Sequence, residues 1–422
     1  MEDSANRKFN MKLYPIYIVL GSDLLFFYGT RVLYLSEVKN ISDANIVLLS
    51  TIFALLSIVA IIFANIINIK KGNRKTLIIG DCIAIASMFI FLVGKNFTQI
   101  AIAQMLTAIG FAMKNISIAP LLRESIPKTK YKNQIFSRID RKAYFSYCII
   151  SALSILVSGY LYDINKYIPM ILCFICTIIS LIISINFKEI EDKNVDENKT
   201  TKSVEMLKEG YVFFIKSKRL KALLLSLGFI WGIFTLYVTY QPTLLKNMNI
   251  RATNICIICT VLEIIRGIGG RLENKYNEKF KNKSLIILSL VISFSFIIAG
   301  IGSLLKMKFA IQILIVILAF LIIEIMRGIY MVLYKRYVNN FTNAKILPTI
   351  YTMTNIFWNL TRVVITAIGS FILTIVEIKI AFIVVGIIFV IFTILIGIYM
   401  KTRIGLNPDL YSKVDLKYDD KK

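Results

Sequence analysis

Residues 45–68 read NIVLLSTIFALLSIVAIIFANIIN, and the basic turn IKKGNRK at 69–75 separates them from a second apolar run at 76–94. A helix needs about 20 predominantly apolar residues to cross the hydrocarbon core of a bilayer. The same pattern, an apolar run followed by a short polar turn, repeats along the whole chain. We therefore expect an all-α membrane protein.

Hydropathy predicts twelve transmembrane helices. They cover residues 13–35, 45–68, 76–94, 99–122, 140–163, 168–187, 220–241, 253–271, 284–304, 309–335, 347–376 and 379–400. Hydrophobic residues make up 57% of the 422 residues, against roughly 45–50% in soluble globular chains. This composition excludes a soluble enzyme, a disordered chain and a secreted disulfide scaffold.

The charge distribution predicts how the chain is oriented. There are 50 Lys and Arg residues and 25 Asp and Glu residues, a net charge of +25. With both termini inside, 37 basic residues fall on cytoplasmic segments and eight on outer loops, as the positive-inside rule requires. The basic residues are divided among seven short segments, so we expect no nucleic-acid partner. The abundance of Ile, Lys and Asn is typical of an AT-rich bacterial genome, which favours a bacterial plasma membrane.

The reactive residue types are restricted. The chain has no His, which excludes a Ser-His-Asp triad and any His-ligated metal. All six Cys lie in apolar runs, including the C-x-x-C pairs Cys173/Cys176 and Cys256/Cys259, and we interpret them as packing residues rather than zinc ligands. No phosphate-cradling Gly-rich loop is present. We therefore expect no metal, no cofactor and no use of ATP.

The chain divides into two halves around a polar stretch at 188–219. Within it, Val204, Leu207, Tyr211 and Ile215 recur at helical spacing, which predicts an amphipathic helix on the cytoplasmic surface. The predicted organisation is an N-terminal six-helix bundle, a cytoplasmic linker, a C-terminal six-helix bundle and a cytoplasmic tail, at 1–187, 188–219, 220–400 and 401–422.

The two halves have related sequences. NISDANI at 40–46 follows the first span, and NIRATNI at 249–255 follows the seventh, with four identities at an offset of 209. We interpret the match as the trace of a duplication. A duplicated six-helix half is typical of a transporter built from parallel repeats.

The turn between the second and third spans carries a basic motif formed by Lys70, Gly72, Arg74 and Lys75. Through this motif, its twelve spans and its long charged central loop, the sequence resembles the major facilitator superfamily over residues 13–400. The family motif has Gly where this chain has Asn65, and Asp where it has Ile69. The family uses that Asp in a cytoplasmic-gate charge network, so its loss puts the usual gate in doubt, with Asn68 or Asp81 as candidate substitutes.

Charged residues inside the predicted spans are the candidate functional residues. An ionisable group at the bilayer centre costs about 2.5–3.5 kcal/mol or more, so it is usually paired or faces water. At ~1.5 Å rise per residue, Asp23, Lys114 and Glu324 lie near mid-membrane. The resemblance implies that spans one, four, seven and ten line a central cavity, and these residues belong to three of those four spans.

Aromatic side chains are candidates for lining such a cavity. Span seven supplies Trp231, Tyr237 and Tyr240, and span one supplies Phe27. These residues suit a bulky organic substrate, although packing and interface anchoring are the favoured explanation.

Two pairs of opposite charges have i, i+3 spacing, Glu263 with Arg266 and Glu324 with Arg327. This spacing places each pair on one helical face within ion-pair reach. Each pair is either an internal salt bridge that orients the bundle or part of the substrate and proton pathway. Arg362 in span eleven is a secondary candidate.

Asp23 has no basic residue at i±3 or i±4. We expect an unpaired buried carboxylate that carries a proton in exchange for substrate. Pairing with Lys114 across the cavity and a packing role are the alternatives.

The resemblance implies a secondary transporter rather than an enzyme. It would move a small organic solute by alternating access, with proton-coupled efflux as the expected mode, acting as an antiporter and a monomer in the lipid bilayer. The alternatives are a transporter-like sensor or non-transporting membrane partner protein and, less favoured, a membrane-embedded lipid-modifying enzyme. The absence of His and the short outer loops argue against the enzyme.

Overall fold

The computed structural model describes residues 2–127, 129, 131–190, 212, 215, 217–341 and 347–403. These residues form helices and short connections, and they contain no strand. The all-α prediction is confirmed. The helices fall into two compact units, each of which has its own core.

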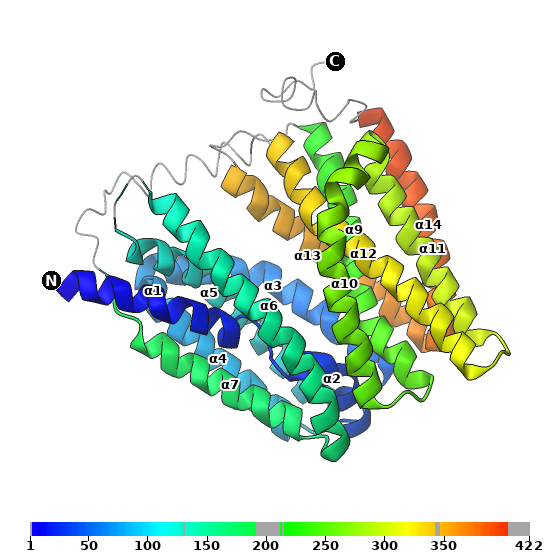
Figure 1. Cartoon of the computed structure of the whole chain (residues 1–422), viewed down its shortest axis with the longest axis horizontal. Helices are drawn as coiled ribbons and strands as arrows, with labels where there is room; N and C mark the ends of the chain where they lie inside the picture. Colours follow the sequence, from blue (N-terminus) through cyan, green and yellow to red (C-terminus); the bar gives the residue numbers. More distant parts are fainter. Residues whose placement is uncertain are drawn as a thin grey trace. The chain divides into compact units, whose positions relative to one another are not determined.

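Unit 1 comprises residues 1–194 and 249–260. Its elements are α1 (Glu2–Gly21), α2 (Phe27–Leu33), a π-helical turn (Tyr34–Val38), α3 (Asp43–Lys71), α4 (Asn73–Val93), α5 (Phe97–Ser125), α6 (Lys132–Ile164), α7 (Ile168–Asn186) and the start of α10 (Ala252–Phe280). Within it α4 packs on α5 and α7, and α1 packs on α5, α6 and α7 (Figure 1).

Unit 2 comprises residues 195–248 and 261–422. Its described elements are α9 (Lys218–Asn247), the rest of α10, a 3-10 turn (Lys281–Lys283), α11 (Ser284–Leu304), α12 (Phe309–Phe341), α13 (Leu347–Ile375) and α14 (Ile378–Arg403). Here α9 packs against α13 and α14, and α11 packs against α12 and α14.

Ten helices of the described part are long and apolar enough to cross a bilayer. Two predicted spans differ from these ten. The span at 253–271 lies in α10, which carries several charges, and the span at 13–35 is interrupted. The count of twelve crossings stays a prediction. The predicted linker helix lies outside the described residues, apart from Val212 and Ile215.

The prediction of one continuous helix over 13–35 is wrong. α1 ends at Gly21, residues 22–26 are not helical, and α2 begins at Phe27 after a left-handed Phe26 (φ 66°). In this break the backbone N–H of Leu24 donates to Asp23 Oδ1 at 2.8 Å. Short polar side chains compete in this way with helical hydrogen bonds. Non-helical backbone at membrane depth is tolerated only inside protein or beside a water-filled cavity.

The repeated sequence segments adopt the same local conformation. Asn40 and Asn249, which are related by the offset of 209, are both left-handed, with φ of 53° and 59°. The helices that follow begin at Asp43 and Ala252, again 209 residues apart. Asn is one of the few residue types that tolerate this region. The sequence match therefore reflects a shared turn.

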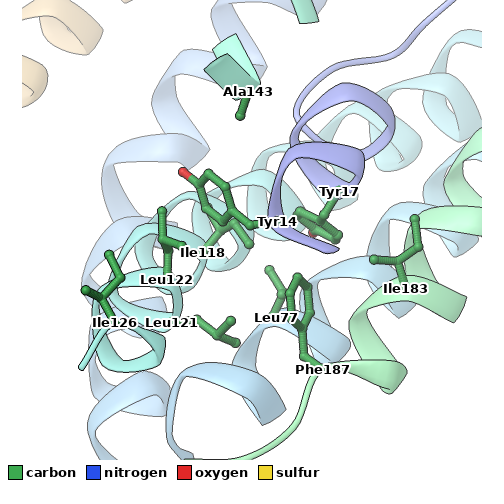
Figure 2. Packing of buried hydrophobic residues seen from close by; sticks show 10 residues of the cluster. All are labelled: Tyr14, Tyr17, Leu77, Ile118, Leu121, Leu122, Ile126, Ala143, Ile183 and Phe187. Carbon is green, nitrogen blue, oxygen red and sulfur yellow. The ribbon is translucent and has the colours of Figure 1, made fainter. Parts of the chain in front are cut away.

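A hydrophobic cluster anchors α1 to unit 1 (Figure 2). Tyr14 and Tyr17 of α1 lie among side chains of α4, α5 and the end of α7, and the ring of Tyr17 meets that of Phe187 edge-on at 5.9 Å. Both tyrosines are 1% exposed. Their hydroxyl groups reach acidic side chains, because Tyr14 donates to Asp140 at 2.6 Å and Tyr17 donates to Asp81.

Candidate functional site

Asp23 lies in the break between α1 and α2 and is half-buried. The hydroxyl group of Tyr147, on α6, donates to Asp23 Oδ2 at 2.8 Å. The expectation of an unpaired carboxylate is therefore wrong, because Tyr147 donates to Asp23 from another helix and Arg31 on α2 interacts with it electrostatically. A non-helical segment that carries a carboxylate resembles the discontinuous helices at the binding sites of many secondary transporters.

Lys114 on α5 pairs with Asp81 on α4, with 3.0 Å between Lys114 Nζ and Asp81 Oδ1. The alternative in which Lys114 pairs with Asp23 is wrong for this structure. Both members are buried, with Lys114 3% and Asp81 0% exposed. Asp81 also accepts hydrogen bonds from Tyr17 at 3.1 Å and from Ser180 at 2.8 Å. This network joins α1, α4, α5 and α7 within unit 1.

Two glycines bring α4 and α5 close enough for this ion pair. A Cβ atom added at Gly80 would lie 3.0 Å from the carbonyl oxygen of Gly110, and the reverse substitution gives the same distance. Small residues permit such close helix crossings in membranes. The crossing lies one residue from Asp81 and about one turn from Lys114, so the small residues and the ion pair form one local feature.

In unit 2, both predicted i, i+3 ion pairs are present. Glu324 Oε1 and Arg327 Nη1 are 3.1 Å apart on α12, and the residues are 3% and 8% exposed. Glu263 and Arg266 pair on α10 and are more exposed. The charges on α10 are close enough to interact electrostatically with Glu324. Among the described residues, nothing donates a hydrogen bond to the buried Oε2 atom of Glu324.

Glycines also bring α10 and α12 together. A Cβ atom at Gly328 would collide with the carbonyl oxygen of Arg266 and lie 2.8 Å from the amide nitrogen of Gly270. Gly269 faces the backbone of Ile325 in the same way. In both units, therefore, buried opposite charges lie beside a crossing made by glycines. The structure thus holds four charges of unit 2 in one cluster.

An aromatic cluster lies on neighbouring helices of unit 2. Trp231 on α9 stacks on Trp358 on α13, with ring centroids 4.6 Å apart and planes at 20°. Tyr334 on α12 meets Trp358 edge-on at 4.8 Å. These are the two Trp residues of the chain, and both are half-buried. Tyr334 lies two turns beyond Arg327 on α12, and Arg362 lies one turn beyond Trp358 on α13, where it is half-buried.

The other predicted aromatic residues lie in the cores of their units. Phe27 is 1% exposed and packs against Tyr34 and Phe91 in unit 1. Tyr237 packs against Phe296 and Phe320. Tyr240 donates a hydrogen bond to the carbonyl oxygen of Gly369 at 2.7 Å. These contacts favour packing roles, whereas Trp231 is half-buried and stacks on Trp358.

The predicted gate motif forms the turn between α3 and α4. Gly72 has φ of 80°, a region that glycine adopts without strain. Arg74 donates to the carbonyl oxygen of Ile185 at 2.8 Å and lies 3.9 Å from Glu189. Lys70 and Lys75 are exposed. Asn68 and Asn73 of this turn are hydrogen-bonded to each other at 2.9 Å.

Inspection of the sequence missed the partners of the mid-membrane charges. Asp81 lies about 12 Å from the start of α4 and Lys114 about 16 Å from the end of α5, at ~1.5 Å per residue. These depths are similar on adjacent helices, so matching the depths of opposite charges would have found the pair. No sequence pattern indicated that Tyr147 would contact Asp23. In the described part of the chain, no cluster of three or more metal-ligating side chains occurs.

The comparisons with known proteins agree with this architecture. The family model of the Major Facilitator Superfamily matches residues 13–360. A search of curated proteins finds no significant match.

The described helices also match solved transporters. A crystal structure of the nucleoside transporter NupG matches with TM-score 0.72 and 8% identity, covering 95% of this chain and 100% of that one. A D-xylose-proton symporter matches with TM-score 0.66 and 11% identity, covering 93% and 96%. At these identities the likeness concerns the fold alone, whereas the family match spans most of the sequence. The chain belongs to the major facilitator superfamily and is a multi-pass membrane protein of the secondary-transporter type.

Proposed function

We propose that the protein is a proton-coupled antiporter that exports a small organic solute across the bacterial plasma membrane by alternating access. In this proposal the chain crosses the membrane twelve times, with both termini in the cytoplasm. The main support for this proposal is the placement of ionisable side chains at mid-membrane depth in both units. Such residues are expensive in hydrocarbon and are typical of substrate and proton pathways.

Asp23 is our candidate for the proton-carrying group in unit 1. It lies in a helix break, where the Tyr147 hydroxyl group donates to it and Arg31 on α2 is close enough to interact with it electrostatically. Asp81 is less suited to this role because Lys114 neutralises it at 3.0 Å. We assign Lys114 to holding α4 and α5 in one arrangement.

Unit 2 is our candidate for solute recognition. The stacked rings of Trp231 and Trp358 offer a flat apolar surface one to two turns from Arg327 and Arg362. The oxygen Oε2 of Glu324 is an acceptor with no donor among the described residues. This combination suits a solute with a ring and at least one hydroxyl or amino donor. The related structures include a nucleoside transporter and a D-xylose symporter, which handle solutes of this kind.

Transport by the purified protein in liposomes tests the proposal. We would measure uptake and release of labelled uridine and D-xylose with and without an imposed pH gradient. We expect the gradient to drive movement of a transported solute and Asp23→Asn to abolish the coupling. Asp43→Asn, in the first turn of α3, is the matched control and should behave as wild type. Coupled transport that survives Asp23→Asn at full rate would reject the assignment of Asp23.

A transporter-like sensor is the second candidate function. The observation that favours it is Ile69, which replaces the Asp of the family motif and is 75% exposed. A sensor would bind solute and show no flux under any gradient. Binding is measurable through the fluorescence of the two stacked Trp residues, so the same purified protein separates the two functions.

A further inference from the structure

Unit 2 has a groove between α9, α13 and α14 that lies apart from its charged cluster. Its volume is about 480 Å³. Among the described residues that line it, only Thr361 has a polar side chain, and its hydroxyl group already donates to the carbonyl oxygen of Gly228 at 2.7 Å. The groove therefore offers no hydrogen bond to a solute and suits a hydrocarbon chain.

The length of the groove matches one leaflet of a bilayer. The residues that line it fall within 225–236 on α9, 357–369 on α13 and 385–396 on α14. At ~1.5 Å rise per residue, each stretch is about 17 Å long. The hydrocarbon core of a bilayer is about 30 Å thick, so one leaflet contributes about 15 Å.

The groove is open along its side. Leu360 and Val364 on α13 are 47% and 57% exposed, and Phe392 on α14 is 44% exposed. In a membrane, such exposed apolar side chains meet lipid tails. An unfilled apolar groove loses dispersion contacts along its whole lining, so an acyl chain from the adjacent leaflet gains them by entering.

The helix turns beyond one end of the groove are basic in sequence. α9 begins at Lys218, and three of its first four residues, 218–221, are basic. α14 ends at Arg403, and its last four residues contain Lys401 and Arg403 and no acidic residue. α9 and α14 pack antiparallel, because Phe229 meets Phe392 and Tyr240 meets Phe382, so both basic turns lie at the end nearest 225 and 396. Basic residues at the membrane surface attract anionic headgroups.

We propose that this groove binds an anionic phospholipid. One acyl chain lies between α9, α13 and α14, and the phosphate lies at the basic turns of α9 and α14. By the positive-inside rule, this end of unit 2 faces the cytoplasm, so the lipid comes from the cytoplasmic leaflet. The proposal does not depend on the transported solute or on proton coupling.

Lipid retention by the full-length protein tests the proposal. Delipidated protein in detergent is mixed with dioleoyl phosphatidylglycerol or dioleoyl phosphatidylcholine, and bound lipid is counted by native mass spectrometry. We expect at least a tenfold preference for phosphatidylglycerol. Equal retention of the two lipids would overturn the proposal, because it would indicate unspecific solvation by lipid.

Two pairs of variants separate the groove from the basic turns. Val364→Trp fills the groove, whereas Leu318→Trp adds the same ring at a 50% exposed position of α12 outside it. We expect the first variant to lose phosphatidylglycerol at least tenfold and the second to retain it. Equal loss in both variants, or in neither, would contradict binding in the groove.

The second pair removes charge. Lys218→Gln, Arg219→Gln and Lys221→Gln together should weaken phosphatidylglycerol binding by roughly fivefold per charge and leave phosphatidylcholine unaffected. Lys279→Gln, Lys281→Gln and Lys283→Gln together remove the same charge at the turn between α10 and α11 and should have little effect. Melting temperatures with and without lipid provide a second readout, because a ligand that binds the folded state raises them.

Discussion

Replacing Lys114 by Met is expected to destabilise unit 1 through the Asp81 carboxylate that it leaves behind. Asp81 is 0% exposed, and Lys114 Nζ lies 3.0 Å from its Oδ1. Removing one member of a buried ion pair typically costs about 3–5 kcal/mol, because the other charge stays buried without compensation. Tyr17 and Ser180 still donate to Asp81 in the variant, so we expect a loss near the lower end, about 3 kcal/mol.

The double variant makes this prediction specific. Asp81→Asn alone leaves the Lys114 ammonium group buried and should cost a similar amount, about 3 kcal/mol. Asp81→Asn with Lys114→Met buries no charge, so its stability should return to within about 1 kcal/mol of wild type. The two substitutions should therefore be strongly non-additive, as expected for residues in contact.

Thermal unfolding of the purified protein, followed by circular dichroism, measures these effects. For a unit of about 200 residues, 1 kcal/mol shifts the melting temperature by roughly 2–4 °C, so each single variant should melt about 6–12 °C below wild type. Lys71→Met, at the exposed end of α3, is the control and should melt with wild type. A double variant whose loss equals the sum of the single losses would refute the ion pair as the source of stability.

Three further predictions concern the other features. Gly328→Ala should destabilise unit 2 by about 1–3 kcal/mol because its Cβ atom meets the backbone of α10. Gly267→Ala, with nothing within 4 Å of its Cβ atom, should be neutral or stabilising by up to about 1 kcal/mol. Melting temperatures that fall equally in the two variants would contradict the close crossing. Tyr147→Phe removes a hydrogen bond to a charged group worth about 1.5 kcal/mol or more, so transport in liposomes should slow about tenfold and change its pH profile, while Tyr144→Phe should match wild type. Trp231→Leu should weaken solute binding about 3- to 10-fold in equilibrium binding assays, and unchanged affinity would remove the aromatic stack from the site.

The hydropathy of the sequence predicted the helices well because length and apolar content decide membrane helices almost alone. The expected run at 45–68 is α3, and the run at 284–304 is α11 with the same bounds. The interruption at 22–26 was not predicted because the segment contains no Pro and no polar run, which are the usual signs of a helix break. It depends on Gly21 and on the local hydrogen bond of Asp23, which are weak signals in an apolar segment.

The candidate site was predicted less completely. Spacing along one helix found the ion pairs Glu263/Arg266 and Glu324/Arg327, because i, i+3 neighbours meet whatever the tertiary structure is. The partners of Asp23 and Lys114 lie on other helices, more than 30 residues away along the chain, and depend on how the helices are rotated and packed. Local spacing contains no such information.

Cysteine accessibility tests most directly whether the mid-membrane charges serve transport. Asp23→Cys and Glu324→Cys would be introduced separately into a chain whose six native Cys are replaced by Ser, and both would be exposed to a charged, membrane-impermeant thiol reagent. We predict that both positions react and that a transported solute protects both, while Leu55→Cys, which is 54% exposed on α3 and faces lipid in this proposal, stays unlabelled. If neither Asp23→Cys nor Glu324→Cys reacts, or if the solute protects neither, these charges are structural and the transport site lies elsewhere.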